Sequence, residues 1–170
     1  MPKSPARLPD DFAASLGHAI ASFGFLEEAL KRAIFALSLE GLGKRPDDRA
    51  VASFLQRMED IADDTLGTLI DQFIKQMGRA QIRDEDHIAA ELRKIRNSRN
   101  LLCHASWRPT EDKTTWHPAF VSSKGEVQDR PISLGDLDRI RAETVEIGTR
   151  VLRVMRATGE QGYWAGDDEA

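Results

Sequence analysis

The stretch from Arg93 to Trp107 holds the residues of this chain that are best suited to chemistry. Within fifteen residues it carries three arginines, two asparagines, one histidine and the only cysteine of the sequence. Arginine presents a fixed fork of hydrogen-bond donors to anions, and histidine can take up and release a proton near neutral pH. We therefore look for a functional site here, and expect the rest of the chain to position it.

Four stretches show the apolar periodicity of long amphipathic helices. Acidic helix-start signals follow Pro9 and Pro46, and a glycine stops each of the first two patterns. Gly17 and Gly24 lie inside the first pattern and are expected to mark the close approach of a neighbouring helix. The expected helices cover residues 10–40, 46–77, 84–104 and 133–155.

The helical period disappears between Trp107 and Pro131. Residues 116–121 and 126–128 flank a Ser-Ser-Lys-Gly sequence, a pattern that is typical of two short strands joined by a turn. We therefore expect a long loop that carries a small β-hairpin between the third and fourth helices.

After this loop, Ser133 and Asp136 resemble a capping box in which Asp replaces Glu, and they open the fourth helix. The expected fold is all-α: a four-helix up-down bundle with the loop and hairpin inserted between helices three and four. One helical domain is expected over residues 9–157, with flexible termini at 1–8 and 158–170.

The bulk composition limits the classes of partner. The 170-residue chain is 41% hydrophobic and 31% charged, with a net charge of −4 and a pI of about 5.6. Its surface as a whole does not favour nucleic acid or an anionic membrane, so any contact with phosphate has to be local. One cysteine excludes an internal disulfide and suits a reducing compartment. With no signal-like start and no long apolar run, a cytoplasmic protein without a membrane partner is expected.

Arg99 lies among apolar residues by helix arithmetic. At about 100° per residue, Leu92 and Leu102 share one face of the third expected helix, and Arg99 falls in the middle of that face. A buried guanidinium needs a partner, and Glu27 lies on the apolar face of the first helix, which predicts a Glu27–Arg99 ion pair. The alternative is that Arg99 extends along its aliphatic stem to solvent. The same arithmetic puts His104 on a different face from Arg99.

Residues 99–104, Arg-Asn-Leu-Leu-Cys-His, match the pattern R-N-x-x-x-H. This pattern resembles the signature of the HEPN superfamily (higher eukaryotes and prokaryotes nucleotide-binding domains), whose members are helical bundles with the motif late in the third major helix. Ala105 and Trp107 are similar to the small and aromatic residues that follow the motif in related chains. The strict resemblance covers residues 93–107. Many members are endoribonucleases that need no metal and serve toxin–antitoxin or other defence systems.

The resemblance implies catalytic roles for three residues. His104 would take the proton from a ribose 2′-OH or give one to the leaving 5′-oxygen. Arg99 would stabilise the charge that develops on the phosphate. Asn100, which is one helical turn before His104, would orient the imidazole or bind the phosphate. The implied products are a 2′,3′-cyclic phosphate and a 5′-hydroxyl, formed with no metal or other cofactor.

The resemblance also implies partners. RNA would be the substrate, and Arg93, Arg96 and Arg108 would form a local basic patch that binds its phosphates. A second copy of the chain would complete the site, because the two motifs of a homodimer meet at a two-fold interface. An antitoxin protein is a further candidate partner.

Each of these residues also has a purely structural interpretation. His104 can be a helix C-terminal histidine that interacts with the helix dipole, and Cys103 is expected to be a small buried hydrophobic residue. His117 can approach the site, but a histidine packed within the loop is the favoured interpretation. The acidic cluster at 59–64 predicts a solvated helix face. The spacing of His, Cys and acidic residues predicts no metal site.

A second class of function therefore stays open beside the ribonuclease. A non-catalytic dimeric bundle of the same descent could bind nucleotides or RNA, or serve as a protein-interaction module. The complete motif favours the enzyme, whereas the acidic balance and the lack of an extended basic groove favour the binding module.

Overall fold

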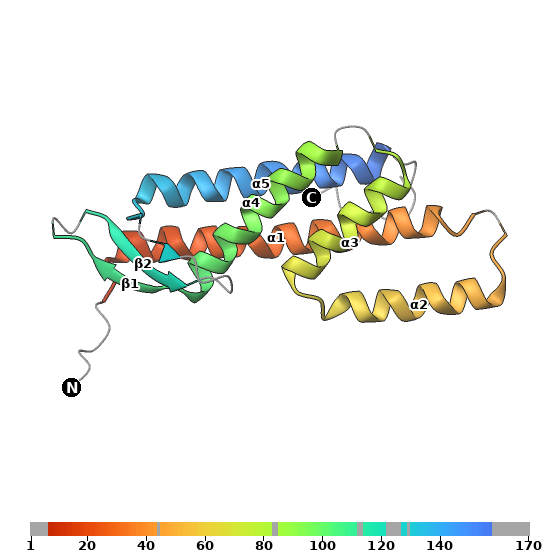
Figure 1. Ribbon diagram of the computed structural model, residues 1–170, viewed down its shortest axis with the longest axis horizontal. Helices are drawn as coiled ribbons and strands as arrows, with labels where there is room; N and C mark the ends of the chain where they lie inside the picture. Colours follow the sequence, from red (N-terminus) through yellow and green to blue (C-terminus); the bar gives the residue numbers. More distant parts are fainter. Residues whose placement is uncertain are drawn as a thin grey trace, which may run out of the picture. The chain divides into compact units, whose positions relative to one another are not determined.

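The computed structural model describes residues 7–43, 45–82, 85–111, 114–121, 127–128 and 130–157. The chain is mostly helical with a small antiparallel sheet, so the predicted helical class is confirmed, whereas the up-down order remains a prediction (Figure 1). The helices are α1 (Asp10–Glu40), α2 (Asp48–Ala62), α3 (Leu66–Arg79), α4 (Glu85–His104) and α5 (Leu134–Ala157). The strands are β1 (Ser106–Pro109), β2 (Trp116–Val121) and β3 (Val127–Gln128). The predicted flexible end at 158–170, and most of that at 1–8, lie outside the described residues.

The expected single helix over residues 46–77 is wrong, because the structure breaks it into α2 and α3. Thr65 caps α3, where its Oγ1 accepts a hydrogen bond from the backbone N–H of Thr68 at 3.4 Å. Asp64 was expected on a solvated helix face, but it lies in the break and accepts a hydrogen bond from Gln72 at 2.6 Å. The described part of the chain thus has five helices in place of the expected four.

The predicted hairpin is confirmed in its strands. β2 and β3 pair antiparallel, with Phe120 opposite Gln128, while the turn at 122–125 lies outside the described residues. β1 was not predicted; it follows α4 and pairs antiparallel with β2, with Ser106 opposite Ala119. The strand order is β1-β2-β3. With four residues, β1 is too short for sequence periodicity to reveal it.

α5 begins with the predicted capping box. The backbone N–H of Ser133 donates to Oδ2 of Asp136 at 3.0 Å, and the backbone N–H of Asp136 donates to Oγ of Ser133 at 3.1 Å. Arg130 and Arg139 each form an ion pair with the Asp136 carboxylate. The hydrogen bonds from the Ser133 backbone and hydroxyl, with the two guanidiniums, hold the pKa of Asp136 below its ordinary value of 3.8.

The chain divides into two compact units, each built from separate stretches of sequence. The first unit joins residues 1–24 to 94–145, and the second joins 25–93 to 146–170. The start of α1, the end of α4, the strands and the start of α5 therefore belong to the first unit, and α2 and α3 belong to the second. None of the described helices carries the sustained apolar run that a bilayer-spanning segment requires.

Aromatic side chains hold the first unit together around the sheet. The ring of Phe12, on α1, lies 5.4 Å from that of Trp107 in an edge-on contact and 5.8 Å from that of Trp116. Trp116 is buried, and its backbone exchanges two hydrogen bonds with that of Ile132, just before α5. Because β1 directly follows the end of α4, these contacts also fix the path of the chain next to the candidate site.

In the second unit, α2 turns back alongside the second half of α1 (Figure 1). The rings of Phe35 and Phe54 lie 5.4 Å apart between the two helices. Nζ of Lys31 donates to the backbone carbonyl of Ala62 at 2.7 Å, which satisfies a carbonyl that the end of α2 leaves without a helical partner. The fully buried side chains of α3 include Leu66, Leu69, Ile70, Phe73 and Met77.

The glycines of α1 do not mark a helix contact, and the expectation for Gly17 and Gly24 is wrong. A Cβ at either position would meet no atom of a neighbouring element within 4 Å. Gly148 of α5 is the glycine that a neighbour approaches closely, because a Cβ there would lie 2.5 Å from Cε1 of Phe25. Close approach thus depends on tertiary packing that glycine alone does not indicate.

Candidate functional site

The candidate site lies at the C-terminal end of α4, within the first unit. α4 begins with Glu85 and Asp86, whose negative charges complement the helix N-terminus. At the middle of α4, Nζ of Lys94 lies 2.9 Å from Oε2 of Glu143 and ties α4 to α5. A stripe of buried apolar side chains sets which way α4 faces: Ile88, Ala89, Leu92, Ile95, Leu101 and Leu102. The packing of this stripe therefore fixes the orientation in which α4 presents the polar residues at its end.

Arg99, Asn100 and His104 are in contact, and we call them the Arg–Asn–His cluster. Nη1 of Arg99 lies 3.3 Å from Nε2 of His104, and donates to Oδ1 of Asn100 at 3.4 Å. A guanidinium has donors only, so this contact is a hydrogen bond when Nε2 of His104 accepts and the ring proton lies on Nδ1. An anion-binding group thus lies directly against a nitrogen that can accept a proton.

This contact could not be expected from helix arithmetic, which puts Arg99 and His104 on different faces. Their backbones are five residues apart, about 140° around the helix axis. The arginine side chain is long enough to cross that separation along the helix surface. His104 is also the last residue of α4, so no further turn of helix lies beyond the imidazole.

The exposure of the cluster fits a site that a large ligand can reach. His104 is exposed, and Arg99 and Asn100 are half-buried. Arg99 is therefore not enclosed in the core, which agrees with the alternative of a guanidinium that extends toward solvent. Glu27 is half-buried on α1 and belongs to the second unit, whereas Arg99 belongs to the first, so their ion pair remains a prediction.

Cys103 is exposed, and the expectation of a small buried hydrophobic residue is wrong. The preceding residues explain the difference. Leu101 and Leu102 are buried and occupy the apolar side of α4 at this level. Cys103 is rotated by about 100° from Leu102 and about 160° from Leu101, so it faces away from the side that these two leucines occupy.

The three arginines expected to bind substrate lie in different environments. Arg96 is half-buried and four residues before Asn100, so the two are neighbours on the surface of α4. Arg108 is exposed on β1, directly opposite His117 of β2. Arg93 is exposed and is the last residue of the second unit. The first unit thus places Arg96 beside the cluster and Arg108 on the strand that follows it.

His117 lies on β2, within the stretch that was predicted as a strand of the hairpin. It is half-buried on β2, and directly opposite residues of an antiparallel pair point to the same side of the sheet. His117 and Arg108 therefore form a second histidine–arginine pair, on the strands that follow the cluster. Sequence analysis did not assign His117 to the site, although the predicted strand at 116–121 could have indicated its partner had β1 been recognised.

Among the residues that the structure describes, no three His, Cys, Asp or Glu side chains gather in a way that could hold a metal ion. No family model, curated protein or solved structure matches the chain. Its function therefore has to be inferred from its own residues and their geometry.

Proposed function

We propose that this protein is an endoribonuclease that cleaves RNA without a metal ion and uses the Arg–Asn–His cluster as its active site. One observation carries the proposal: the guanidinium of Arg99 lies 3.3 Å from Nε2 of the exposed His104. A group that donates hydrogen bonds to an anion and a group that accepts a proton can, at this distance, act on one phosphodiester at the same time.

In the proposed reaction, an incoming phosphate competes for the Arg99 guanidinium and releases Nε2 of His104. His104 then accepts the proton of the ribose 2′-OH, and the 2′-oxygen attacks the phosphorus. Arg99 stabilises the added negative charge, and Asn100 orients the imidazole or binds a phosphate oxygen. The bond from phosphorus to the 5′-oxygen breaks, and that oxygen leaves with a proton. The products are a 2′,3′-cyclic phosphate and a 5′-hydroxyl.

We further propose a homodimer in which two clusters share one cleft. One His104 would then serve as base while His104 of the second copy donates a proton to the leaving oxygen. Arg93, Arg96 and Arg108 would bind neighbouring phosphates of the RNA. A sedimentation measurement that shows only monomer during active cleavage would contradict this arrangement.

The test is cleavage of mixed-sequence single-stranded RNA in EDTA. We expect cyclic-phosphate ends from the wild type, and a loss of roughly 100-fold or more in rate for His104→Ala. Arg99→Lys keeps the charge but lacks the fork of donors, and should lose roughly 100-fold. His18→Ala removes an exposed histidine of α1 outside the cluster and should cleave like the wild type.

The second candidate is a non-catalytic dimeric module that binds RNA, nucleotides or a protein, and the net charge of −4 favours it. Absence of cleavage by folded, dimeric wild type would favour this candidate. Equal cleavage by wild type and His104→Ala would overturn the proposed active site. A role as a toxin or defence effector, with an antitoxin partner, predicts that expression of the wild type but not of His104→Ala arrests cell growth.

A further inference from the structure

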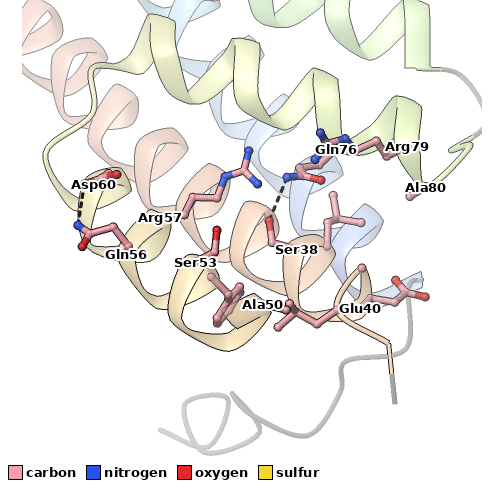
Figure 2. Close-up of a pocket in the computed structure, with 14 residues that line it drawn as sticks. Ser38, Glu40, Ala50, Ser53, Gln56, Arg57, Asp60, Gln76, Arg79 and Ala80 are labelled. Atoms are coloured by element: carbon pink, nitrogen blue, oxygen red, sulfur yellow. Dashed lines mark hydrogen bonds between the residues drawn. The ribbon is translucent and has the colours of Figure 1, made fainter. Parts of the chain in front are cut away.

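The second unit contains a cavity of about 980 Å³ that lies between the C-terminal end of α1 and helices α2 and α3 (Figure 2). The contact of Phe35 with Phe54, and the hydrogen bond from Lys31 to the Ala62 carbonyl, hold α2 against α1. The break before Thr65 turns the chain back, so that α3 forms the opposite wall. None of the cavity residues belongs to the Arg–Asn–His cluster.

One wall of the cavity is polar, and a hydrogen bond between two helices holds part of it in place. Gln76 of α3 is only 5% exposed, and its Nε2 donates to Oγ of Ser38 at 3.1 Å. Arg57 of α2 is half-buried, and Figure 2 shows its guanidinium directed toward Ser38 and Gln76. Ser53 lies one turn before Arg57 on α2, and Arg79 lines the cavity from the end of α3. Donor groups from three helices therefore converge.

Within the described part of the chain, neither Arg57 nor Arg79 makes a hydrogen bond or an ion pair. The acidic residues of the lining are directed elsewhere. Asp60 accepts a hydrogen bond from Gln56 at 3.3 Å at one end of the cavity, and Figure 2 shows Glu40 extending away at the other. Arg57 is half-buried and Arg79 is exposed, and a half-buried arginine without an acidic partner favours an anion beside it.

The remaining lining offers an apolar surface next to these donors. Leu37 is buried, and Leu42, Ala50 and Phe54 are partly exposed to the cavity. Known small-molecule sites combine such apolar walls with a few convergent polar groups in volumes of roughly 300–1,000 Å³. Both the volume and the lining thus match a ligand with a charged group and an apolar body.

We propose that this cavity binds a small organic anion. Arg57 and Arg79 hold its phosphate or carboxylate group, with Ser38 and Ser53 as additional donors, and its apolar body packs against Phe54. Guanidinium geometry matches phosphate and carboxylate equally, because each anion can accept two parallel N–H bonds. The site does not depend on the proposed nuclease activity.

Titration of the full-length chain followed by NMR chemical shifts tests this proposal with four probes: phenyl phosphate, benzoate, benzyl alcohol and inorganic phosphate. We expect phenyl phosphate or benzoate to bind at least about tenfold more tightly than benzyl alcohol, because a charge-assisted hydrogen bond contributes that much. Inorganic phosphate, which lacks the apolar body, should bind more weakly than phenyl phosphate. The tighter of the two aromatic anions identifies the preferred head group. The backbone signals of Ser38, Ser53 and Gln76 should shift.

Arg57→Gln should lower the affinity for the aromatic anion that binds more tightly, by about tenfold or more. Arg49→Gln is the matched control, since Arg49 is exposed on the same helix and does not line the cavity, and it should bind like the wild type. Equal binding by both variants would overturn the proposal. The probe comparison on wild type needs no variant to fold, and equal binding of benzyl alcohol and both anions, or no binding at all, would overturn it as well.

Discussion

Arg99 combines an apolar position on α4 with a charged head group, and the structure resolves this conflict through the length of the side chain. Arg99 is half-buried, and its Nη1 reaches Asn100 and the exposed His104. In the proposed enzyme this arrangement has a chemical consequence. The hydrogen bond to Arg99 keeps Nε2 of His104 occupied until a phosphate displaces it, so the base becomes available when substrate arrives.

Glycine positions show the same dependence on what surrounds a residue. Gly24 lies in α1 with open space where a Cβ would be, whereas the ring of Phe25 lies 2.5 Å from that position at Gly148. Gly24→Ala should therefore stabilise the protein by about 0.5–1 kcal/mol, because alanine has the higher helix propensity. At Gly148 the same gain is opposed by overpacking, which typically costs about 1–3 kcal/mol.

Urea unfolding of Gly24→Ala and Gly148→Ala measures this difference directly. We expect the unfolding midpoint to rise for the first variant and to fall, or stay unchanged, for the second. An equal rise in both would show that Phe25, which is 39% exposed, moves aside without cost.

At the scale of helices and strands, the sequence predicted what depends on local pattern. Apolar periodicity predicted the helical class and the extents of α1, α4 and α5, and turn residues predicted the pairing of β2 with β3. The break between α2 and α3 was not predicted, although the step from Ile61 to Leu66 is five residues and interrupts the three- and four-residue apolar spacing. Thr65, followed by Leu66, was the available cap signal. The Arg99–His104 contact depends on side-chain reach, which periodicity does not describe.

The capping box at the start of α5 makes stability depend on acid. The pKa of Asp136 is lowered in the folded protein by its hydrogen bonds from Ser133, then by Arg130 and Arg139. The charged cap therefore stabilises the folded state fully above the ordinary pKa of 3.8, and this contribution is lost as pH falls through the lower folded value. Asp136→Asn should lower the free energy of unfolding at pH 7 by about 1 kcal/mol. Below about pH 4, the free energy of unfolding should then fall less steeply with pH than it does in the wild type.

Chemical denaturation at several pH values above and below the ordinary pKa of 3.8 tests this prediction. Asp138→Asn removes one charge from the same helix without touching the cap, and serves as the control. Parallel pH profiles for Asp136→Asn and the wild type would contradict an acid-sensitive cap. Ser133→Ala should change the profile in the same direction as Asp136→Asn.

At the scale of the whole molecule, a net charge of −4 limits how RNA can bind. If Arg93, Arg96, Arg99 and Arg108 are the phosphate contacts, few counterions are released. For single strands each contact contributes about −0.7 to the slope of log K against log salt, so the four arginines of one copy give about −3, and those of both copies of the proposed dimer give no more than about −6. His104→Ala allows this binding to be measured without cleavage.

Fluorescence anisotropy of labelled RNA at several salt concentrations gives the slope. Arg108→Gln should reduce its magnitude by about 0.7 for each copy that contacts the RNA, whereas Arg153→Gln, an exposed site on α5 in the second unit, should leave it unchanged. A much steeper slope would place the RNA on a different surface. A slope near zero would show that phosphate contacts do not hold it.

The discontinuity of the two units has a consequence for the order in which the chain can assemble during synthesis. The first unit needs residues 1–24 and 94–145 together, so the beginning of α1 has no complete partner until the chain has been made to the start of α5. The cavity residues, from Leu37 to Ala80, are all synthesised before the Arg–Asn–His cluster. Contacts that are local in sequence form quickly, and distant ones wait for loop closure. The cavity between α1, α2 and α3 can therefore begin to form on a nascent chain that does not yet contain the proposed nuclease site.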